Sequence, residues 1–539
     1  MRALLAPYDK TGLIDFARGL VSLDWQLIAT GNTERQLREA GLPVTSVAEV
    51  IGFPEILDGR VKTLHPAIHG GLLARRDRPE HMRELADHGI EAIDLVVNNL
   101  YPFEATINKP GVTLDEAIEN IDIGGPAMLR AAAKNFESVI VLCDPADYPM
   151  VLSELQTGDI SGEQRRVFAA KSFQHVALYD TLVARYLREE VRSPSGDADA
   201  DQPAAKGVTF PDELTIAMRK REDLDLRYGE NPHQAGALYL EAGRRQQGVS
   251  GFEQLHGITM SFNNVLDADA AWRTASDFTD PTIAIVKHLN PCGLASHEDL
   301  KVAYERALSG DPISAFGGIV ACNRPIDGEL AAAMRASVSP SSGQRMLYEI
   351  ILAPGFTDDA LEALRRWRNV RILKVPGAHG SPQADDAFPY DLRRVGGGFL
   401  MQEPDNKPDP DLEFKTVSQR EPTEEELADM RFAWRACKHI RSNAIVLARD
   451  RTLLGMGTGQ PNRIVSVELA VKRAGDRARG SVLASDAYFP FFDGMATAAA
   501  AGIAAAVEPG GSVRDAEVVA VADAAGMALV FTGERHFRH

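Results

Sequence analysis

The sequence contains few cysteines and no long hydrophobic run. Four cysteines occur among 539 residues, and they lie far apart, at Cys143, Cys292, Cys322 and Cys437. This spacing fits neither a disulfide framework nor a Cys-x-x-Cys metal site, so we expect a reduced, cytoplasmic protein. No apolar stretch approaches the roughly 18 residues of a membrane-spanning helix, and the apolar segment at the N-terminus is too short for a signal peptide.

Basic residues are also in deficit. Lysine and arginine total 58 against 76 aspartates and glutamates, which gives a net charge of −18. This balance argues against a nucleic-acid or membrane-surface partner, although it is compatible with a local basic pocket for a phosphorylated substrate. The hydrophobic content of 45% is ordinary for a globular protein. A chain of this length is too long for one core, so we expect two to four domains.

The N-terminal third alternates strand-like runs with amphipathic helical segments. Residues 3–6, 26–30, 94–98 and 138–142 are apolar runs of strand length, and residues 13–20 place their apolar side chains on one helical face. Thr113 and Glu116 have the spacing of a capping box that opens a helix. Such alternation predicts a doubly wound, parallel α/β sheet, followed by helical sequence to about residue 191.

A polar, turn-rich segment then marks the best domain boundary. It covers residues 192–206, and we assign 1–195 to one domain, 196–206 to a linker and 207–539 to a second α/β region. The second region is long enough for two subdomains. Residues 378–390 have the composition of an exposed loop. The strand-like runs of this region cover residues 282–286, 317–321, 349–353, 371–375, 444–448, 517–521 and 527–531.

A Lys-His pair follows one of these runs. Residues 281–286 predict a buried strand, and Asn290-Pro-Cys-Gly293 is typical of the turn that stops it. Lys287 and His288 would then stand at a strand end, where the imidazole can take a proton from a nucleophile and the ammonium can stabilise an oxyanion. Taken alone, the spacing favours a solvated lysine and a structural histidine over chemistry.

Polar motifs also follow the predicted N-terminal strands. Tyr8-Asp9-Lys10, Thr30-Gly31-Asn32-Thr33 and Asn98-Asn99 each stand where a strand gives way to a loop, and such loops expose N–H groups that suit a phosphate. By itself, Thr-Gly-Asn-Thr is more often an N-capped helix start. Residues 60–63 add two cations and a hydroxyl, which favours an anion site.

Four competing interpretations have weaker support. Residues 455–459 are expected to follow a strand, but they have the spacing Gly-x-Gly-x-Gly rather than the Gly-x-Gly-x-x-Gly of dinucleotide-binding folds. A zinc deaminase would need a second cysteine where Ala295 stands, and no histidine has glutamate two residues later. His65 and His69 have metal-ligand spacing but no nearby acidic partner, so we expect no catalytic metal. The N-terminal domain could also be a non-catalytic effector-binding module.

An ordered set of motifs runs along essentially the whole chain: Asp9-Lys-Thr-Gly12, Gly59-Arg-Val-Lys-Thr-Leu-His-Pro66, Asn98-Asn-Leu-Tyr-Pro-Phe103, Ile121-Asp-Ile-Gly-Gly125, Leu226-Arg-Tyr-Gly-Glu-Asn-Pro-His-Gln234, Ser261-Phe-Asn-Asn-Val-Leu-Asp267, Ile285-Val-Lys-His-Leu-Asn-Pro-Cys-Gly293, Asp311-Pro-Ile-Ser-Ala-Phe-Gly-Gly318, Arg441-Ser-Asn-Ala444, Gly455-Met-Gly-Thr-Gly-Gln460 and Ser485-Asp-Ala-Tyr-Phe-Pro-Phe-Phe-Asp493. Taken together and in this order, these motifs resemble the bifunctional AICAR transformylase/IMP cyclohydrolase family of purine biosynthesis.

This resemblance implies a fold and two activities. The N-terminal domain would be methylglyoxal synthase-like, and the transformylase region would contain two cytidine deaminase-like subdomains. That region would transfer a formyl group from 10-formyltetrahydrofolate to the 5-amine of AICAR, and the N-terminal domain would close formylated AICAR to IMP with loss of water. The family also implies a homodimer in which Arg227 and Tyr228 reach the neighbouring subunit's site, with no nucleic-acid or membrane partner.

The resemblance assigns the cyclohydrolase residues by position. Lys134 and Asp122 would manage protons, supported by Lys62 and Tyr101, and retention of both Lys134 and Asp122 speaks against a non-catalytic module. Tyr8 stands where serine is common, which loosens its assignment. The residues assigned to the nucleotide, its ring or its carboxamide are Tyr8, Asp9, Lys10, Thr30, Gly31, Asn32, Thr33, Arg60, Val61, Thr63, Asn98, Asn99, Asp122 and Ile123.

The transformylase residues are assigned in the same way. His288 would be the general base, and Lys287 and the Asn443 amide would stabilise the oxyanion of the tetrahedral intermediate. Tyr488 stands where phenylalanine is common, which loosens that assignment. AICAR contacts are assigned to Arg227, Tyr228, Gly317, Glu349, Arg463, Tyr488 and Arg535, and folate contacts to Ile464, Asp493 and the turn ending at Ser512.

Overall fold

The computed structural model describes residues 1–57, 60–192, 210–244, 246–377, 390–405 and 413–539. The predicted linker 196–206 and most of the predicted loop 378–390 lie outside these residues. The described chain divides into an N-terminal unit, residues 1–219 with 241–244, and a C-terminal unit, residues 220–240 with 245–539. The short strands β6 (Met218–Lys220) and β7 (Tyr239–Glu241) stand where the chain passes between the units.

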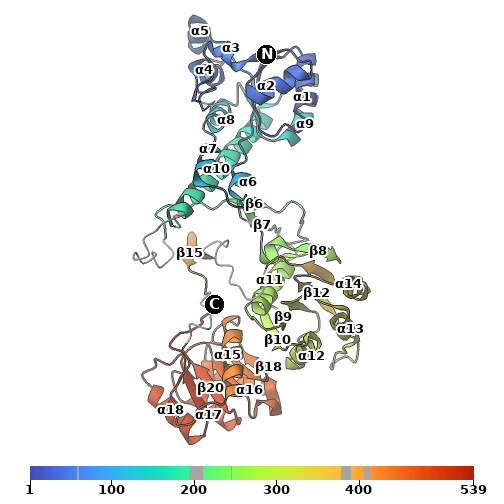
Figure 1. Ribbon diagram of the computed structural model, residues 1–539, viewed down its shortest axis with the longest axis vertical. Helices are drawn as coiled ribbons and strands as arrows, with labels where there is room; N and C mark the ends of the chain where they lie inside the picture. The colour runs from blue at the N-terminus through green and yellow to red at the C-terminus, as the bar shows by residue number, and fades with distance from the viewer. Residues whose placement is uncertain (58–59, 193–209, 245, 378–389, 406–412) are drawn as a thin grey trace. The chain divides into compact units, whose positions relative to one another are not determined.

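The N-terminal unit, coloured blue to teal in Figure 1, is built on a five-stranded, wholly parallel sheet in the order β3-β2-β1-β4-β5. The four predicted strand runs are β1, β2, β4 and β5, whose apolar side chains are almost all buried because helices flank the sheet. The predicted parallel sheet is confirmed. Its strands are β1 (Arg2–Leu5), β2 (Gln26–Ala29), β3 (Val44–Ser46), β4 (Leu95–Val97) and β5 (Ile140–Leu142).

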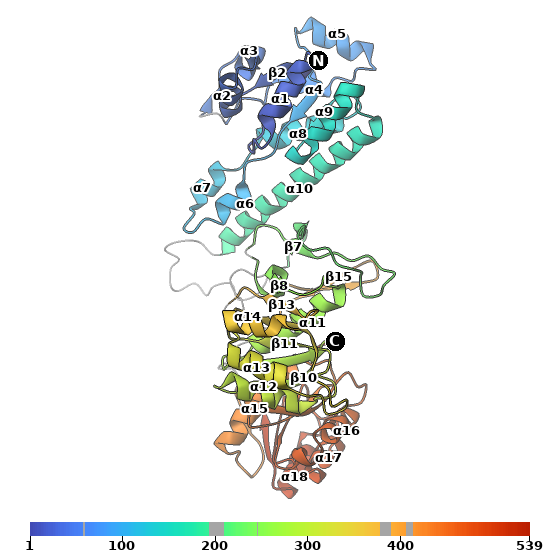
Figure 2. The same cartoon turned by 90° about the vertical axis from the view of Figure 1, so that its right-hand side faces the viewer.

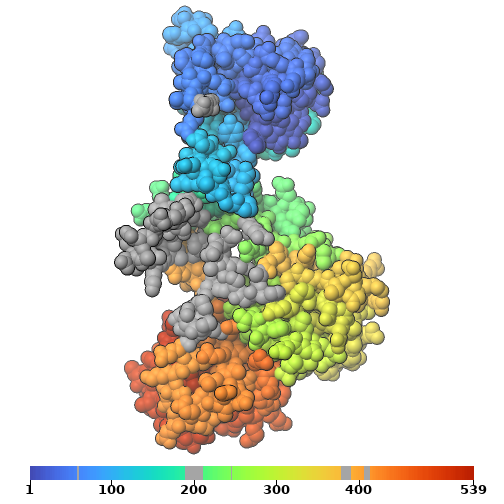
Figure 3. Space-filling view, viewed as in Figure 1, coloured from blue at the N-terminus to red at the C-terminus, as the bar shows by residue number. Residues whose placement is uncertain are grey.

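Helices of this unit form as their sequences indicate. Leu13, Phe16 and Leu20 are buried on one face of α1, and the capping box of Thr113 and Glu116 opens α7. Helix α6 lies beside α10 (Figure 2), and Phe103 of α6 packs edge-to-face on Tyr179 of α10, with ring centroids 6.1 Å apart. In Figure 3, α6 and α7 lie within the light-blue part of this unit's surface. The helices are α1 (Leu13–Ser22), α2 (Gly31–Glu39), α3 (Val47–Ile51), α4 (Pro66–Leu73), α5 (Pro79–Asp87), α6 (Phe103–Ile107), α7 (Leu114–Glu119), α8 (Gly124–Lys134), α9 (Tyr148–Thr157) and α10 (Gly162–Arg192).

The C-terminal unit contains one twelve-stranded mixed sheet that is an internal duplication. Its order is β16-β21-β20-β19-β17-β18-β10-β9-β11-β12-β13-β8, and within the described residues the strands of the two halves pair only between β10 and β18, where Ala295 lies opposite Thr452. Each half has an antiparallel hairpin, then three mutually parallel strands, then an antiparallel edge strand. The C-terminal unit therefore contains two subdomains of the same topology.

Each strand of the first half has an equivalent in the second half. The pairs are β8 (Glu253–His256) and β16 (Lys415–Thr416), β9 (Thr282–Lys287) and β17 (Ile445–Arg449), β10 (Asn290–Ser296) and β18 (Thr452–Gly457), β11 (Gly318–Cys322) and β19 (Val482–Ser485), β12 (Tyr348–Ala353) and β20 (Ala505–Glu508), and β13 (Arg371–Lys374) and β21 (Ala528–Phe531); a separate hairpin contains β14 (Asp391–Val395) and β15 (Gly398–Gln402).

Helices cover both faces of this sheet. The shared core beneath α11 and α15 contains Ala284 and Val286, whereas Ile283 and Ile285 point to the opposite core beneath α12 to α14. This alternation is the period of two expected for a strand buried on both faces. The helices, again in equivalent pairs, are α11 (Phe262–Ser276) and α15 (Glu424–Lys438), α12 (Leu300–Gly310) and α16 (Arg463–Ala474), α13 (Gly328–Ala336) and α17 (Asp493–Ala500), and α14 (Asp358–Arg365) and α18 (Asp515–Ala524).

Three sequence expectations for this unit are wrong. Residues 517–521 belong to helix α18 rather than to a strand, because Val518 and Ala522 are buried four residues apart. Asn290-Pro-Cys-Gly293 is part of strand β10 rather than a turn. Gly455 and Gly457 lie inside β18 rather than after it, where a Cβ on either would collide with the backbone of α16.

Candidate functional site

The N-terminal candidate site lies where the strand order of the parallel sheet reverses, between β1 and β4. Ligands of open α/β sheets bind beyond the carboxyl ends of strands at such a point. The Asn99 side chain joins the two loops there, since Nδ2 donates to the carbonyl of Asp9 at 3.1 Å and Oδ1 accepts from its N–H at 2.8 Å. Asn98 is buried, and its Nδ2 contacts no hydrogen-bond acceptor among the described residues.

Asp122 reaches the same place from the loop before α8. Its Oδ1 accepts the N–H of Gly125 at 2.8 Å, and a Cβ at Gly125 would collide with both the Asp122 carboxylate and the Asn98 amide. Burial raises the pKa of Asp122, while N–H bonds from Gly125 and Tyr101 and the charge of Lys62 oppose that rise. A carboxyl group held in this way can keep a proton closer to neutral pH than an exposed aspartate can.

The other predicted loops complete the surroundings of this site. Lys10 folds back so that Nζ donates to the carbonyls of Pro7 and Tyr8, each at 3.1 Å, and burial lowers its pKa against the charge of Asp9. Thr30 precedes α2 as its N-cap, but its hydroxyl donates to Glu55 at 2.7 Å instead of capping the helix. Thr33 and Thr63 are buried, Lys62 and Val61 are partly exposed, and Tyr8, Asp9, Gly31, Asn32, Arg60, Tyr101 and Ile123 are exposed.

Lys134 is not brought to this cluster. It is the exposed last residue of α8, whereas Asp122 precedes the first residue of the same helix. Ten residues at 1.5 Å each separate Gly124 from Lys134, which is about 15 Å along the helix axis. The neighbouring Asn135 is held to α4 by hydrogen bonds to the carbonyls of Leu72 and Ala74, so this end of α8 is fixed away from Asp122.

In the C-terminal unit, the Lys-His pair stands at a tight and strained turn. Lys287 pairs with Asn290 across the β9–β10 hairpin, so His288 and Leu289 alone form its loop. Their φ angles are 52° and 63°, as a type I′ turn requires. Non-glycine residues pay about 1–2 kcal/mol each for such left-handed backbone. His288 is exposed as a result, and Lys287 Nζ donates to the Phe316 carbonyl at 2.7 Å, next to Gly317.

Beside this turn, the first subdomain gathers further charged groups. Glu349, at the start of β12, accepts the Asn264 amide at 2.9 Å and lies 3.7 Å from the buried guanidinium of Arg371. Burial lowers the pKa of Arg371, Glu349 raises it, and the charge of the exposed Arg227 lowers it. Tyr228 lies beside Arg227, whose guanidinium is 5.4 Å from its ring centroid. Sequence reasoning missed Arg371 and Asn264, although Asn264 stands within a quoted motif.

The second subdomain contributes a buried polar network. Asn443 Nδ2 donates to the Gln460 carbonyl at 2.7 Å, and Asn443 Oδ1 accepts from Arg463 at 2.7 Å. Arg463 also pairs with buried Asp486, so its guanidinium is engaged inside the protein. Ile464 is partly exposed beside it, Ser512 is partly exposed, and Tyr488, Asp493 and Arg535 are exposed.

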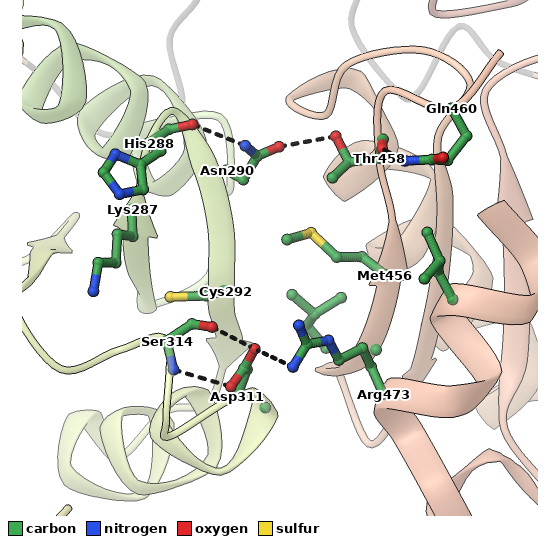
Figure 4. A pocket seen from close by; sticks show the side chains of 14 residues that line it. Lys287, His288, Asn290, Cys292, Asp311, Ser314, Met456, Thr458, Gln460 and Arg473 are labelled. Carbon is green, nitrogen blue, oxygen red and sulfur yellow. Dashed lines mark hydrogen bonds and ion pairs between the residues drawn. The ribbon is translucent and has the colours of Figure 1, made fainter. Parts of the chain in front are cut away.

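A cavity of about 290 Å³ separates the hairpins of the two subdomains. Thr458 donates to Asn290 Oδ1 at 2.9 Å at one end, and Arg473 pairs with Asp311 at 3.4 Å at the other (Figure 4). Lys287 and His288 line it, yet Figure 4 shows their side chains directed to the far side of β10 from Met456. The cavity is therefore not where these two side chains meet a substrate.

The described residues contain neither a metal-binding cluster nor a membrane-spanning helix. Within the described residues, no group of three or more histidine, cysteine, aspartate or glutamate side chains could hold a metal ion. None of the helices in the described parts of the chain is both long enough and apolar enough to cross a membrane.

Two family models match this chain. A family model described as AICARFT/IMPCHase bienzyme matches residues 132–473, and one described as MGS-like domain matches residues 12–127. The bifunctional purine biosynthesis protein PurH of Chloroflexus aurantiacus is 51% identical over 100% of this chain and 99% of its own. PurH of Desulfitobacterium hafniense is 49% identical over 100% of this chain and 99% of its own, and PurH of Listeria monocytogenes is 46% identical over the whole of both chains.

The crystal structure of ForH is 43% identical and covers 35% of this chain and 98% of its own, at a TM-score of 0.32. The PurH relatives match along the full length, so the resemblance inferred from the ordered motifs is confirmed. The α/β fold class, with an MGS-like N-terminal domain, is confirmed as well. The chain belongs to the AICARFT/IMPCHase bienzyme family.

Proposed function

We propose that the two activities of this bifunctional purine-biosynthesis enzyme divide between the two units, with formyl transfer centred on His288. The substrates would be AICAR and 10-formyltetrahydrofolate, and the enzyme would act in the cytoplasm. The observation that carries the assignment is the strained His288–Leu289 turn. Left-handed backbone at non-glycine residues persists where the surrounding structure enforces it, commonly at functional sites.

The transfer step uses three groups. The exposed imidazole of His288 takes a proton from the 5-amine of AICAR as that nitrogen attacks the formyl carbon. Lys287 and the second N–H of the Asn443 amide stabilise the oxyanion that forms on the formyl oxygen. The bond from the formyl carbon to N10 of the folate then breaks, and N10 takes up the proton from the imidazolium.

The cyclisation step belongs to the N-terminal unit. The carboxamide nitrogen of formylated AICAR attacks the formyl carbon, and water leaves from the resulting adduct. Asp122 supports this chemistry because its raised pKa lets it hold and release a proton among Asn98, Asn99 and Gly125. Lys134 remains a prediction of the resemblance, since the length of α8 separates it from Gly124 by about 15 Å along the helix axis.

The overall reaction is tested by supplying the full chain with AICAR and 10-formyltetrahydrofolate. We expect IMP to form, with formylated AICAR as the intermediate resolved by chromatography. His288→Ala should stop intermediate formation but still convert added formylated AICAR to IMP. Failure of the unaltered chain to form either product would contradict the assignment.

We further propose a homodimer in which Arg227 and Tyr228 complete the neighbouring subunit's transformylase site. Arg227 is exposed, as a residue that reaches a second copy must be. Mixing His288→Ala with Arg227→Ala chains should then restore transfer, because one site of each heterodimer receives both native residues. Absence of restored activity in a verified heterodimer would show that the two residues serve the same subunit's site.

A further inference from the structure

Asp267, which no assignment above includes, lies directly beneath the Lys-His turn. It stands on α11, and its Oδ1 accepts the N–H of Leu289 at 2.8 Å. Burial raises the pKa of Asp267, while the N–H groups of Leu289 and His288 and the charge of His288 lower it, so both N–H groups of the turn face this carboxylate. One carboxylate therefore bonds the backbone of Leu289 and faces that of His288, the two loop residues whose φ angles are positive.

The second subdomain contains the same arrangement without the Lys-His pair. Asp429 on α15 accepts the N–H groups of Asp450 and Arg451 at 2.9 and 2.6 Å. These two residues form the equivalent β17–β18 turn, with φ angles of 53° and 51°. Each subdomain thus has a helix aspartate that bonds the backbone of a left-handed hairpin turn, and only the turn of the first subdomain carries a residue proposed to react.

We infer that Asp267 is a positioning residue for formyl transfer: by accepting the N–H of Leu289 and facing that of His288, it holds the His288 imidazole where it can reach the amine of AICAR. The inference rests on the proposed function of His288. Backbone N–H groups that bond an ionised carboxylate form short, strong hydrogen bonds. They offset the cost of left-handed backbone at two residues that lack the freedom of glycine.

The matched variants are Asp267→Asn and Asp429→Asn in the full-length chain. An amide can accept one N–H through Oδ1, but its own NH₂ group opposes the second, so each variant loosens its own turn. We expect Asp267→Asn to slow single-turnover formyl transfer about 10²-fold, the usual cost of a misplaced reacting group. AICAR affinity should change less than about twofold, because those contacts lie elsewhere. Asp429→Asn should transfer formyl at close to the unaltered rate.

Cyclohydrolase activity and the melting temperature of each sample show that both units are folded. Equal transfer rates for the two variants, whether both normal or both slow, would overturn the inference. If the unaltered chain transfers no formyl at all, the proposed function fails instead, so the two failures are distinguishable.

A measurement on the unaltered chain does not depend on the stability of either variant. Hydrogen exchange resolved to single residues should show protected amides at His288 and Leu289. Exchange at the rate of an unprotected loop would overturn the inference.

Discussion

Glu508, the last residue of β20, makes the stability of the C-terminal unit depend on pH. Its side chain is fully buried, and it accepts the N–H of Phe489 at 2.6 Å. Burial is the main cause that raises the pKa of Glu508 from 4.5 to about 8, with the N–H of Phe489 and the charge of Arg463 opposing and Asp515 adding to the rise. The folded chain therefore binds this proton more tightly than the unfolded chain does.

The sign and size of the effect follow from linkage. The proton's contribution to stability is complete below pH 4.5 and is lost as pH rises toward 8, at about 1.4 kcal/mol for each pH unit. By pH 7 the loss amounts to about 3 kcal/mol. Glu508→Gln keeps an oxygen for the N–H of Phe489 but never ionises, so it should not lose this stability.

We therefore expect Glu508→Gln to match the unaltered chain at pH 4 and to exceed it by about 3 kcal/mol at pH 7. Urea unfolding, followed by fluorescence of the tryptophans in the C-terminal unit, measures the difference at each pH. Glu253→Gln makes the same chemical change at an exposed site of that unit and should leave the pH dependence unchanged. Parallel curves for Glu508→Gln and the unaltered chain from pH 5 to 8 would refute the reasoning.

Three further predictions concern the two activities. His288→Ala should lower single-turnover formyl transfer by about 10²–10⁴-fold with little change in AICAR affinity; an early-melting variant that transfers at the normal rate would remove His288 from the mechanism. Asp122→Asn should damage cyclisation, measured with formylated AICAR, and spare transfer, and the resemblance predicts the same result for Lys134→Ala although α8 separates Lys134 from Asp122; equal loss of both activities in a folded variant would contradict separate sites. Fragment 1–195 should still cyclise, but melt below the full chain, because residues 217 and 242 contribute to the same core; a soluble, folded fragment without activity would contradict the division.

The sequence was sufficient for the elements whose apolar pattern is unambiguous. Strands β1, β4 and β9 are short, mostly apolar runs with at most one residue that is not buried, and each is predicted close to its observed bounds. The run 517–521 failed because a short apolar stretch has no period long enough to separate strand from helix. Strand β18 was missed because Gly455 and Gly457 weaken a strand pattern, and only the close approach of α16 explains them.

The site was harder to predict than the fold. His288 and Leu289 carry no turn signal, since type I′ turns favour Asn-Gly or Gly-Gly. What allows the turn is the carboxylate of Asp267, which lies about twenty residues earlier and belongs to a helix. A contact of this kind depends on tertiary structure. The local sequence therefore predicts the turn at Asn290-Pro-Cys-Gly293, directly after the residues His288 and Leu289 that form it.

The duplication explains how one topology supports two different contributions to transfer. Both hairpin turns are held by a helix carboxylate, so both copies possess a rigid, left-handed loop. In the first copy, that loop exposes an imidazole, which a proton-transfer group needs in order to meet its substrate. In the second copy, the polar groups proposed to act are withdrawn into the network of Asn443, Arg463 and Asp486. A half-buried amide fixed by two hydrogen bonds is pre-oriented to stabilise an oxyanion without reorganisation during the reaction.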